Sequence, residues 1–242
     1  MGTPMMSRSS PVRLTTPTFN LLTAKFLFAL LHLYRTPAFF KLLSPHLEWK
    51  IKTHDKTIFL TFDDGPIPGL TPYILNQLYG IGARATFFCV GDNVCKFPEI
   101  FQAVIDRGHA VGNHTFNHLK AWKTSTAAYL ENVHKCQRVL IENGLVSDRP
   151  LFRPPHGQLT PRAINTLKQA YRIIMWDVLS YDFSKAHTAE KSLDQIIKKT
   201  RPGSIVVFHD NYKAEEKLKY VLPRYLRHFS ELGYSFKKLT AD

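Results

Sequence analysis

Apolar and polar positions follow a regular pattern from residue 57 onward. Short runs rich in Ile, Val, Phe and Thr, which suit buried strands, alternate with longer stretches of helical character. The expected strands are 57–62, 85–90, 109–113, 150–153, 172–178, 204–209 and 234–239. Strands and helices that alternate in this way predict a parallel sheet covered by helices.

Helix start and stop signals fall between these runs. Thr71-Pro72 and Thr160-Pro161 each place an N-cap residue before a proline at the first helical position, and Pro98 fits a similar place. Left-handed glycines are expected where helices stop, at Gly108, Gly144 and Gly233. About seven strand–helix units predict an α/β fold, a (β/α) barrel of parallel strands. The alternative is an open doubly wound sheet, but no Gly-rich phosphate loop follows the first strand.

The first 50 residues differ from the rest, so we divide the chain into an N-terminal part, 1–50, and a main domain, 51–242. Residues 1–20 are rich in Ser, Thr and Pro, and an apolar run follows at 21–34. That run is short for a membrane span and contains Lys25. It predicts an extra helical segment, packed or peripheral, with a membrane anchor or uncleaved signal as the alternative. No clear cleavage site is present, and localisation stays open between the cytoplasm and the membrane or cell envelope.

The amino-acid composition limits the classes of binding partner that can be expected. The 242 residues are 44% hydrophobic and 12% aromatic, enough for a packed core, and the net charge is +13. Such a charge favours anionic partners, namely nucleic acid, a membrane surface or a cell-wall polymer. No cluster of Arg with interleaved aromatics resembles a nucleic-acid module, so we expect no nucleic-acid partner. The 3 cysteines include no CxxC, which supports neither a disulfide framework nor a cysteine zinc site.

Candidate chemistry collects where the expected strands end. These residues are Asp63, Asp64, His114, Arg153, Asp177, His209 and Asp210. The carboxyl ends of parallel barrel strands meet on one face, where active sites are built. Charged and imidazole side chains at five such ends predict an active site there.

Two motifs suggest which residues of that site bind a metal and which take part in proton transfer. Residues 61–66 read TFDDGP, which is ordinary turn chemistry or a pair of carboxylates with separate tasks. His114 and His118 lie four residues apart and would share one face if the segment turned as a helix. With a strand-end carboxylate they form a His-His-Asp set, which suits a catalytic metal site of the zinc type.

The remaining residues can then take acid–base roles. One Asp would bind the metal, and the other would act as a general base on water. Arg153 is the candidate cation that favours the charged form of the base and positions it. His209, on a separate strand end, could supply the proton that a leaving amine needs.

These motifs resemble the polysaccharide deacetylase family, carbohydrate esterase family four, over about residues 57–210. TFDDGP matches its first motif in full, and His114, Thr115 and His118 match its second motif, H-[ST]-x-x-H. The resemblance implies Asp63 as base, with Asp64, His114 and His118 as metal ligands. Residues 153–157 resemble the third motif and residues 205–210 the fifth, and the fifth implies His209 as general acid. The family fold is a distorted (β/α) barrel.

Some positions depart from the family pattern. His156 stands where the family has Tyr, a position whose backbone N–H is the family's oxyanion donor. The fourth motif, D-x-x-D-W, aligns with residues 179–183, where Leu179 replaces the first Asp, which in the family supports the acid His. Asp177, two residues earlier on the same strand face, is our candidate replacement. Phe183 and Val207 replace a Trp and a Leu and resemble an apolar wall of the acetyl pocket.

The resemblance implies a metal-dependent hydrolase that removes N-acetyl groups from amino sugars of a glycan, of the peptidoglycan or chitin type. We expect one divalent metal ion, zinc or cobalt, and an N-acetylated glycan as substrate. A deacylase of O-acetyl esters or non-sugar amides, and an inactive glycan-binding protein, are the alternatives. Peripheral membrane contact is expected only through the N-terminal segment, and no obligate protein partner is expected.

Overall fold

The structure, a computed structural model, describes residues 33–42 and 44–240. Contacts divide the chain into two units, Met1–Leu33 and Tyr34–Asp242, and the elements below belong to the second. The helix predicted for residues 21–34 lies almost wholly outside the described residues. Within the described part of the chain, the helices are too short or too polar to cross a membrane.

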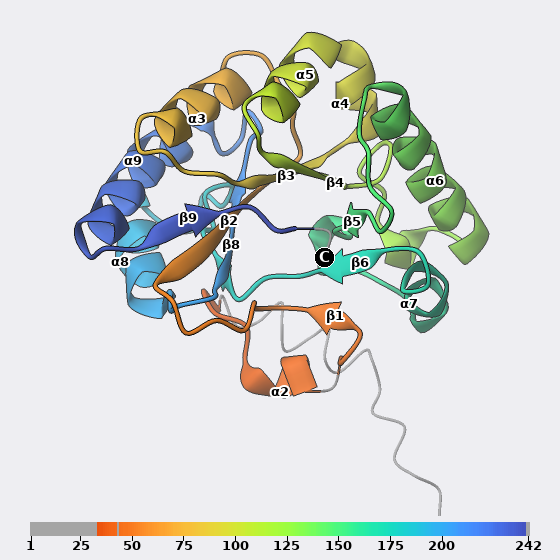
Figure 1. Ribbon diagram of the computed structural model, residues 1–242. Coiled ribbons are helices and arrows are strands. Elements are labelled where there is room, and N and C mark those ends of the chain that lie inside the picture. The colour runs from red at the N-terminus through yellow and green to blue at the C-terminus, as the bar shows by residue number, and fades with distance from the viewer. Residues whose placement is uncertain (1–32, 43, 241–242) are drawn as a thin grey trace, which may run out of the picture. The chain divides into compact units, whose positions relative to one another are not determined.

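Among the described residues, nine strands form a single sheet, and all of their pairings are parallel (Figure 1). The strand order is β1-β6-β5-β4-β3-β2-β8-β7, and β9 pairs with β2. Their bounds are β1 Leu47–Glu48, β2 Thr57–Asp63, β3 Thr86–Cys89, β4 Ala110–Asn113, β5 Leu151–Phe152, β6 Arg172–Ile174, β7 Val178–Leu179, β8 Ile205–His209 and β9 Ser235–Lys237. The predicted α/β class with a parallel sheet is confirmed, with more strands than the seven expected.

The prediction of one strand over 172–178 is wrong, and the difference explains the barrel. β6 and β7 are separated only by residues 175–177, yet they lie near opposite ends of the strand order. In a flat sheet, six strand spacings of about 4.8 Å would place them roughly 29 Å apart. The four residue steps that join them reach at most about 15 Å. The sheet therefore curves into a distorted barrel, and the open doubly wound alternative is excluded.

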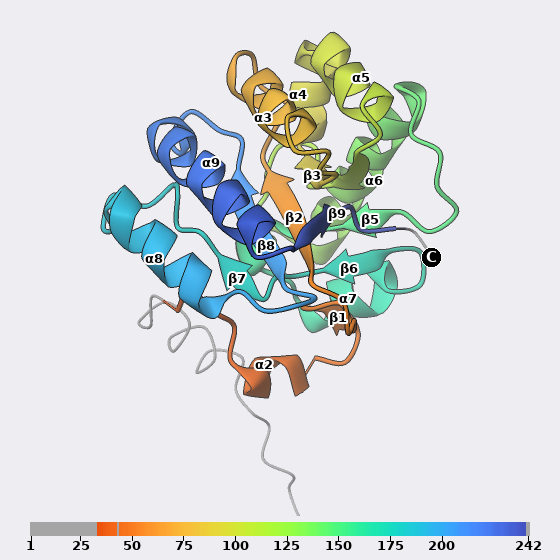
Figure 2. The same cartoon turned by 60° about the vertical axis from the view of Figure 1, so that its left-hand side comes forward.

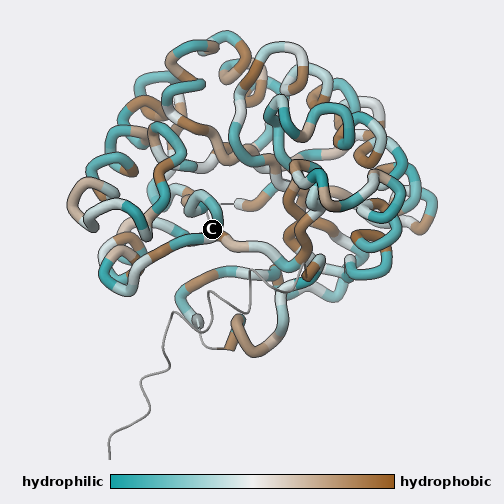
Figure 3. Tube along the Cα trace, turned by 180° about the vertical axis from the view of Figure 1, so that it is seen from behind, coloured by the Kyte–Doolittle hydropathy of each residue, from teal (hydrophilic) through white to brown (hydrophobic). Residues whose placement is uncertain are grey.

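Helices cover the outside of this curved sheet (Figures 1 and 2). On β2, Ile58, Leu60 and Phe62 belong to the main hydrophobic core that the helices also enter, while the alternate Asp63 lies on the inner face. Figure 3 shows hydrophobic residues running through the central strands. The helix bounds are α2 Ala38–Leu42, α3 Leu70–Tyr79, α4 Gly91–Lys96, α5 Pro98–Asp106, α6 Thr126–Glu142, α7 Pro161–Leu167, α8 Ala189–Lys199 and α9 Glu215–Glu231, with 3-10 turns Ala121–Lys123 and Pro155–Gly157.

Most of the predicted helix signals are confirmed. Thr160 caps α7 by accepting a hydrogen bond from the Ala163 amide, and Pro98 begins α5. The three predicted stop glycines have positive φ angles, at Gly108, Gly144 and Gly233. Thr71 is an exception, because α3 begins at Leu70 and the Thr71 hydroxyl instead donates to the Asp210 carboxylate.

Residues 34–42 and 44–50 lie at the opening of the barrel. The Tyr34 carbonyl accepts from the Leu179 amide at 3.0 Å, and the Thr36 amide donates to the Asp177 carbonyl at 2.9 Å. These bonds cover the free edge of β7, while β1 extends the sheet beside β6. The segment therefore occupies the place where further strands would complete a closed barrel.

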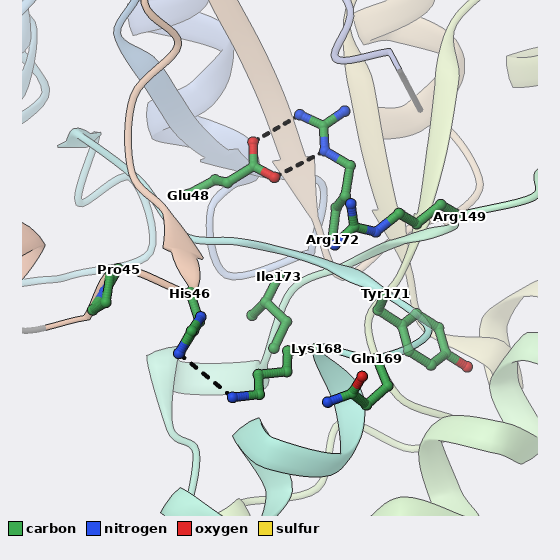
Figure 4. Close-up of a pocket in the computed structure, with 9 residues that line it drawn as sticks. All are labelled: Pro45, His46, Glu48, Arg149, Lys168, Gln169, Tyr171, Arg172 and Ile173. Atoms are coloured by element: carbon green, nitrogen blue, oxygen red, sulfur yellow. Dashed lines mark hydrogen bonds and ion pairs between the residues drawn. The ribbon is translucent and has the colours of Figure 1, made fainter.

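An ion pair fastens β1 to β6. Glu48 accepts from Arg172 Nε at 2.8 Å and from Arg172 Nη2 at 2.7 Å, a two-bond arrangement that fixes both side chains (Figure 4). The pair lies in a cavity of about 360 Å³, in which His46 and Lys168 face each other at 3.4 Å. β1 therefore belongs to the same sheet as β6, within the unit that begins at Tyr34.

Asp177 holds the closing segment to the barrel. Its buried carboxylate accepts from Arg35 Nε at 3.1 Å, from Ser204 Oγ at 2.6 Å and from Lys41 Nζ. Burial alone would raise the pKa of Asp177, but Lys41, Ser204 and Arg35 outweigh it and hold the pKa below its ordinary value of 3.8.

Replacing Asp177 with Asn is expected to lower the free energy of unfolding by about 1–3 kcal/mol at pH 7, because buried donors lose a charged acceptor. Its two cationic partners are 36% and 22% exposed, which keeps the effect below that of a fully buried pair. Since the folded-state pKa is depressed, the contribution is present above about pH 4 and is lost as the pH falls through the folded value. Urea unfolding of both proteins should therefore give curves that converge in acid, whereas a pH-independent difference would contradict the ionic role.

Candidate metal centre and active site

The structure brings six predicted site residues to the carboxyl end of the barrel. Asp63 ends β2 and His209 ends β8, and the two are paired in register across adjacent strands. The other four lie just beyond the ends of β2, β4 and β5, namely Asp64, His114, His118 and Arg153. Among the described residues, Asp64, His114 and His118 form the group whose ligand atoms all lie within 4.8 Å of one another.

The three candidate ligands point their free atoms at one place. Asp64 Oδ1 lies 3.1 Å from His118 Nε2 and 3.5 Å from His114 Nε2. This oxygen is buried, and no described residue supplies a well-formed hydrogen bond to it. Burial alone would raise the pKa of Asp64, but His114, His118 and then His209 outweigh it and hold the pKa well below its ordinary range.

The state of the His114 ring tests whether this group suits a metal. His114 Nδ1 lies 2.8 Å from the Arg153 carbonyl oxygen, which can only accept, so Nδ1 carries the hydrogen. In the neutral ring, Nε2 then presents its lone pair toward Asp64. A carboxylate oxygen and two imidazole nitrogens that converge at one partly buried place suit a shared cation. The residues present therefore fit a divalent metal ion.

The two histidines meet in a different way from the prediction. Residues 114–118 form no helix, and Thr115 and His118 have positive φ angles of 65° and 58°. The loop is held from outside, because Asn113 Oδ1 accepts from the Thr115 amide and Asn132 Oδ1 accepts from the Phe116 amide. The prediction that a helical turn brings His114 and His118 together is wrong. The two rings do come together, with centroids 5.1 Å apart.

Asp63 lies beside the ligand group and is paired with a buried arginine. Arg153 Nη1 donates to Asp63 Oδ1 at 2.7 Å and to Thr61 Oγ1 at 2.6 Å. The guanidinium is fully buried, also donates to the Met175 carbonyl, and lies 4.1 Å from the centre of the Phe88 ring. With so many fixed contacts, Arg153 both neutralises the Asp63 carboxylate and sets its orientation.

His209 is supported by Asp182 and not by Asp177. Asp182 Oδ1 lies 2.8 Å from His209 Nδ1, and Asp182 Oδ2 accepts from the His209 amide at 2.8 Å. Asp177 does not support His209 as predicted, because its amide donates to the Ile205 carbonyl at the opposite end of β8. Burial alone would lower the pKa of His209, but Asp182, with help from Asp64 and Asp63, raises it to about 9.

Replacing Asp182 with Asn is expected to move the alkaline limb of kcat/KM to lower pH, by roughly one unit or more. His209 is protonated below its pKa of about 9, so a proton donor at this position is lost as the pH rises through that value. The measurement is a pH–rate profile of both proteins, with metal affinity measured beside it. An unshifted limb at equal metal content would mean that His209 is not the titrating group.

The three predicted substrate-binding residues surround these groups. The Phe183 ring lies 4.8 Å from the His209 ring, and the His156 ring lies 4.6 Å from the His118 ring. Val207 is buried and shares the inner face of β8 with His209. Burial, followed by the effects of the neighbouring His118 and Lys120, lowers the pKa of His156 to about 4, so its ring is neutral near pH 7.

Asp210 supports the site from behind. Its Oδ1 accepts from the Gly65 amide at 2.9 Å, and its Oδ2 accepts from Thr71 Oγ1 at 2.7 Å. A Cβ at position 65 would lie 1.8 Å from Asp210 Oδ2, which is why TFDDGP needs a glycine there. Asp210 was expected at a strand end without a role, and in the structure it holds the backbone directly after Asp64.

Barrels that gather carboxylates and imidazoles at the carboxyl ends of their strands are typical of enzymes. The chain matches the polysaccharide deacetylase family over residues 50–172. It is 33% identical over 193 residues to a peptidoglycan-N-acetylglucosamine deacetylase of Bacillus cereus, covering 79% of this chain and 90% of that protein. It is 33% identical over 171 residues to a chitooligosaccharide deacetylase of Azorhizobium caulinodans, covering 69% and 80%.

A solved peptidoglycan N-acetylglucosamine deacetylase has a similar fold, with a TM-score of 0.76 and 26% identity, over 84% of this chain and 95% of that one. The protein therefore belongs to the polysaccharide deacetylase family, as its motifs predicted.

Proposed function

We propose that this protein is a metal-dependent hydrolase that removes N-acetyl groups from amino sugars of a glycan, of the peptidoglycan or chitooligosaccharide kind. The observation that carries the proposal is the pairing of Asp63 and His209 across β2 and β8, directly beside the Asp64–His114–His118 group. A candidate base and a candidate acid thus stand on adjacent strand ends next to a group that could hold a cation. The named activities of the relatives support this substrate class.

Asp64, His114 and His118 would hold the metal ion through Oδ1 and the two Nε2 atoms. Two imidazoles and one carboxylate suit zinc, cobalt or a similar divalent ion. When bound, such an ion supplies Lewis acidity, which lowers the pKa of water and polarises a carbonyl group. The His114–Arg153 carbonyl bond fixes the ring that must face the ion.

Asp63 is the proposed general base. It stands next to the ligand group, and its Oδ1 is engaged by Arg153, so its other oxygen can take a proton from the attacking water. The buried guanidinium prevents rotation of the carboxylate and balances its charge. Attack of water on the acetyl carbon forms the new C–O bond.

His209 is the proposed general acid. Asp182 holds its Nδ1, which leaves Nε2 to donate a proton to the amide nitrogen as the C–N bond breaks. The products are acetate and a free amino sugar. Phe183 and Val207 would form the apolar wall for the acetyl methyl group, and His156 would contact the sugar through a neutral ring.

Acetate release tests the proposal. Purified protein, loaded with zinc or cobalt, would be given chitooligomers, peptidoglycan fragments and acetylated xylan, with a chelator control. Chelator-sensitive release from N-acetylated glycans is the expected result. Release from acetylated xylan alone would assign an esterase instead, and no release from any substrate by metal-loaded protein would contradict the proposal.

A further inference from the structure

Asn211 makes two hydrogen bonds that join the candidate metal centre to the start of α9. Its Nδ2 donates to Asp64 Oδ2 at 2.5 Å, and its Oδ1 accepts from the Ala214 amide at 3.0 Å. The Ala214 N–H can only donate, so the amide of Asn211 cannot be turned round. The donor side of Asn211 therefore faces Asp64, and its position is set by the turn that begins α9.

This contact separates the two oxygens of Asp64. Oδ2 is taken by the Asn211 amide, while Oδ1, buried and without a well-formed hydrogen bond from a described residue, faces His114 and His118. A carboxylate with both oxygens free can bind a cation through one or both of them. Here one oxygen is already engaged by a neutral donor on the side away from the histidines.

The backbone around Asp64 is held as firmly as its side chain. Asp64 has a φ angle of 90°, and its carbonyl accepts from Asn93 Nδ2 at 2.8 Å. The next amide, of Gly65, donates to Asp210. Asp210 and Asn211 are consecutive, so one short segment after β8 fixes both the backbone beyond Asp64 and the outer oxygen of its carboxylate.

We propose that Asn211 is a positioning residue that makes Asp64 a one-oxygen metal ligand. This inference rests on the proposed metal-dependent function. Three protein atoms, one from each of Asp64, His114 and His118, then leave coordination positions open for water and substrate. Release of Oδ2 would allow Asp64 to rotate or to bind through both oxygens, which changes both affinity and geometry.

The test compares Asn211→Ser and Asn211→Ala with the wild type. Ser is too short to reach Asp64 but can still accept from the amide three residues later, as Ser125 does from Ala128. Ala loses both contacts. Asn143→Ser is the matched control, because the Asn143 amide donates to the Val139 carbonyl at the end of α6. Metal affinity would be measured by competition with a chromophoric chelator, and coordination by the visible absorption of the cobalt(II) protein.

We expect Asn211→Ser and Asn211→Ala to weaken zinc and cobalt binding equally, by about 10-fold or more, as outer-shell changes do. The cobalt(II) absorption should change in both, while Asn143→Ser matches the wild type. Equal affinity and spectra in wild type and Asn211→Ser would overturn the inference, and so would a loss confined to Asn211→Ala, which would assign the effect to the α9 turn. Those outcomes leave the deacetylase proposal intact, whereas a wild type that binds no metal would remove both.

Discussion

Replacing His114 with Ala is expected to weaken the binding of a divalent cation by more than about 100-fold, beyond the loss typical of outer-shell partners. The change removes one of the three converging atoms and leaves Asp64 Oδ1 with a single imidazole partner. Deacetylation should fall with metal occupancy, because neither Asp63 nor His209 can supply Lewis acidity.

The measurement is metal content and affinity, together with acetate release at saturating metal. His134→Ala is the matched control, since His134 lies exposed on α6 away from the site. Thermal unfolding in the presence of chelator would show whether loss of the His114–Arg153 contact alters the metal-free fold. If His114→Ala bound the ion as tightly as His134→Ala, the assigned ligand group would be wrong.

Much of the fold follows from local pattern. The strands at 57–63 and 205–209 are runs of apolar, β-branched and aromatic residues, whose burial on both faces is typical of parallel sheets. The catalytic end of the barrel was also predictable, because a parallel sheet carries all strand ends to one edge. Asp63 and His209 could therefore be placed together without knowing which strands are neighbours.

Features that depend on the curvature of the sheet could not be predicted. The run 172–178 is apolar apart from Arg172 and Asp177, and nothing local shows that it leaves the sheet near one end of the strand order and rejoins it at the other. Because 172–178 was predicted to be one strand, Asp177 was expected near the end of β8 that carries His209, whereas it lies beside Ile205 at the other end. Asp182 is the carboxylate of the fourth motif, so a search for the partner of His209 could have considered it, but the loop that turns it back is not visible in sequence.

The loop 114–118, which carries both histidines, could not be predicted for a different reason. Spacing placed His114 and His118 together for a helical reason that does not apply, because Thr115 and His118 adopt left-handed conformations. The contacts that hold this loop come from Asn113 and Asn132, on β4 and α6. A polar side chain that organises a loop from another element leaves no periodic signal, and the same is true of Asn211.

Replacing Asp63 with Asn separates catalysis from metal binding. An amide oxygen can still accept from Arg153, so the side chain should keep its place, but an amide cannot take a proton from water. We expect kcat to fall by about 100- to 10,000-fold, the range typical of a lost general base. Metal affinity should stay within about threefold, because Asp63 is not among the three converging ligands.

Acetate release and metal titration on the same preparation would check this, with Asp92→Asn as control, because Asp92 pairs with Lys96 on the surface of α4. Retained activity would mean that another group accepts the proton. Lost metal binding would instead make Asp63 a ligand, and the division of labour between the adjacent carboxylates would then be reversed. Only inactive protein with an intact metal site agrees with a pair in which Asp64 holds the ion and Asp63 takes the proton.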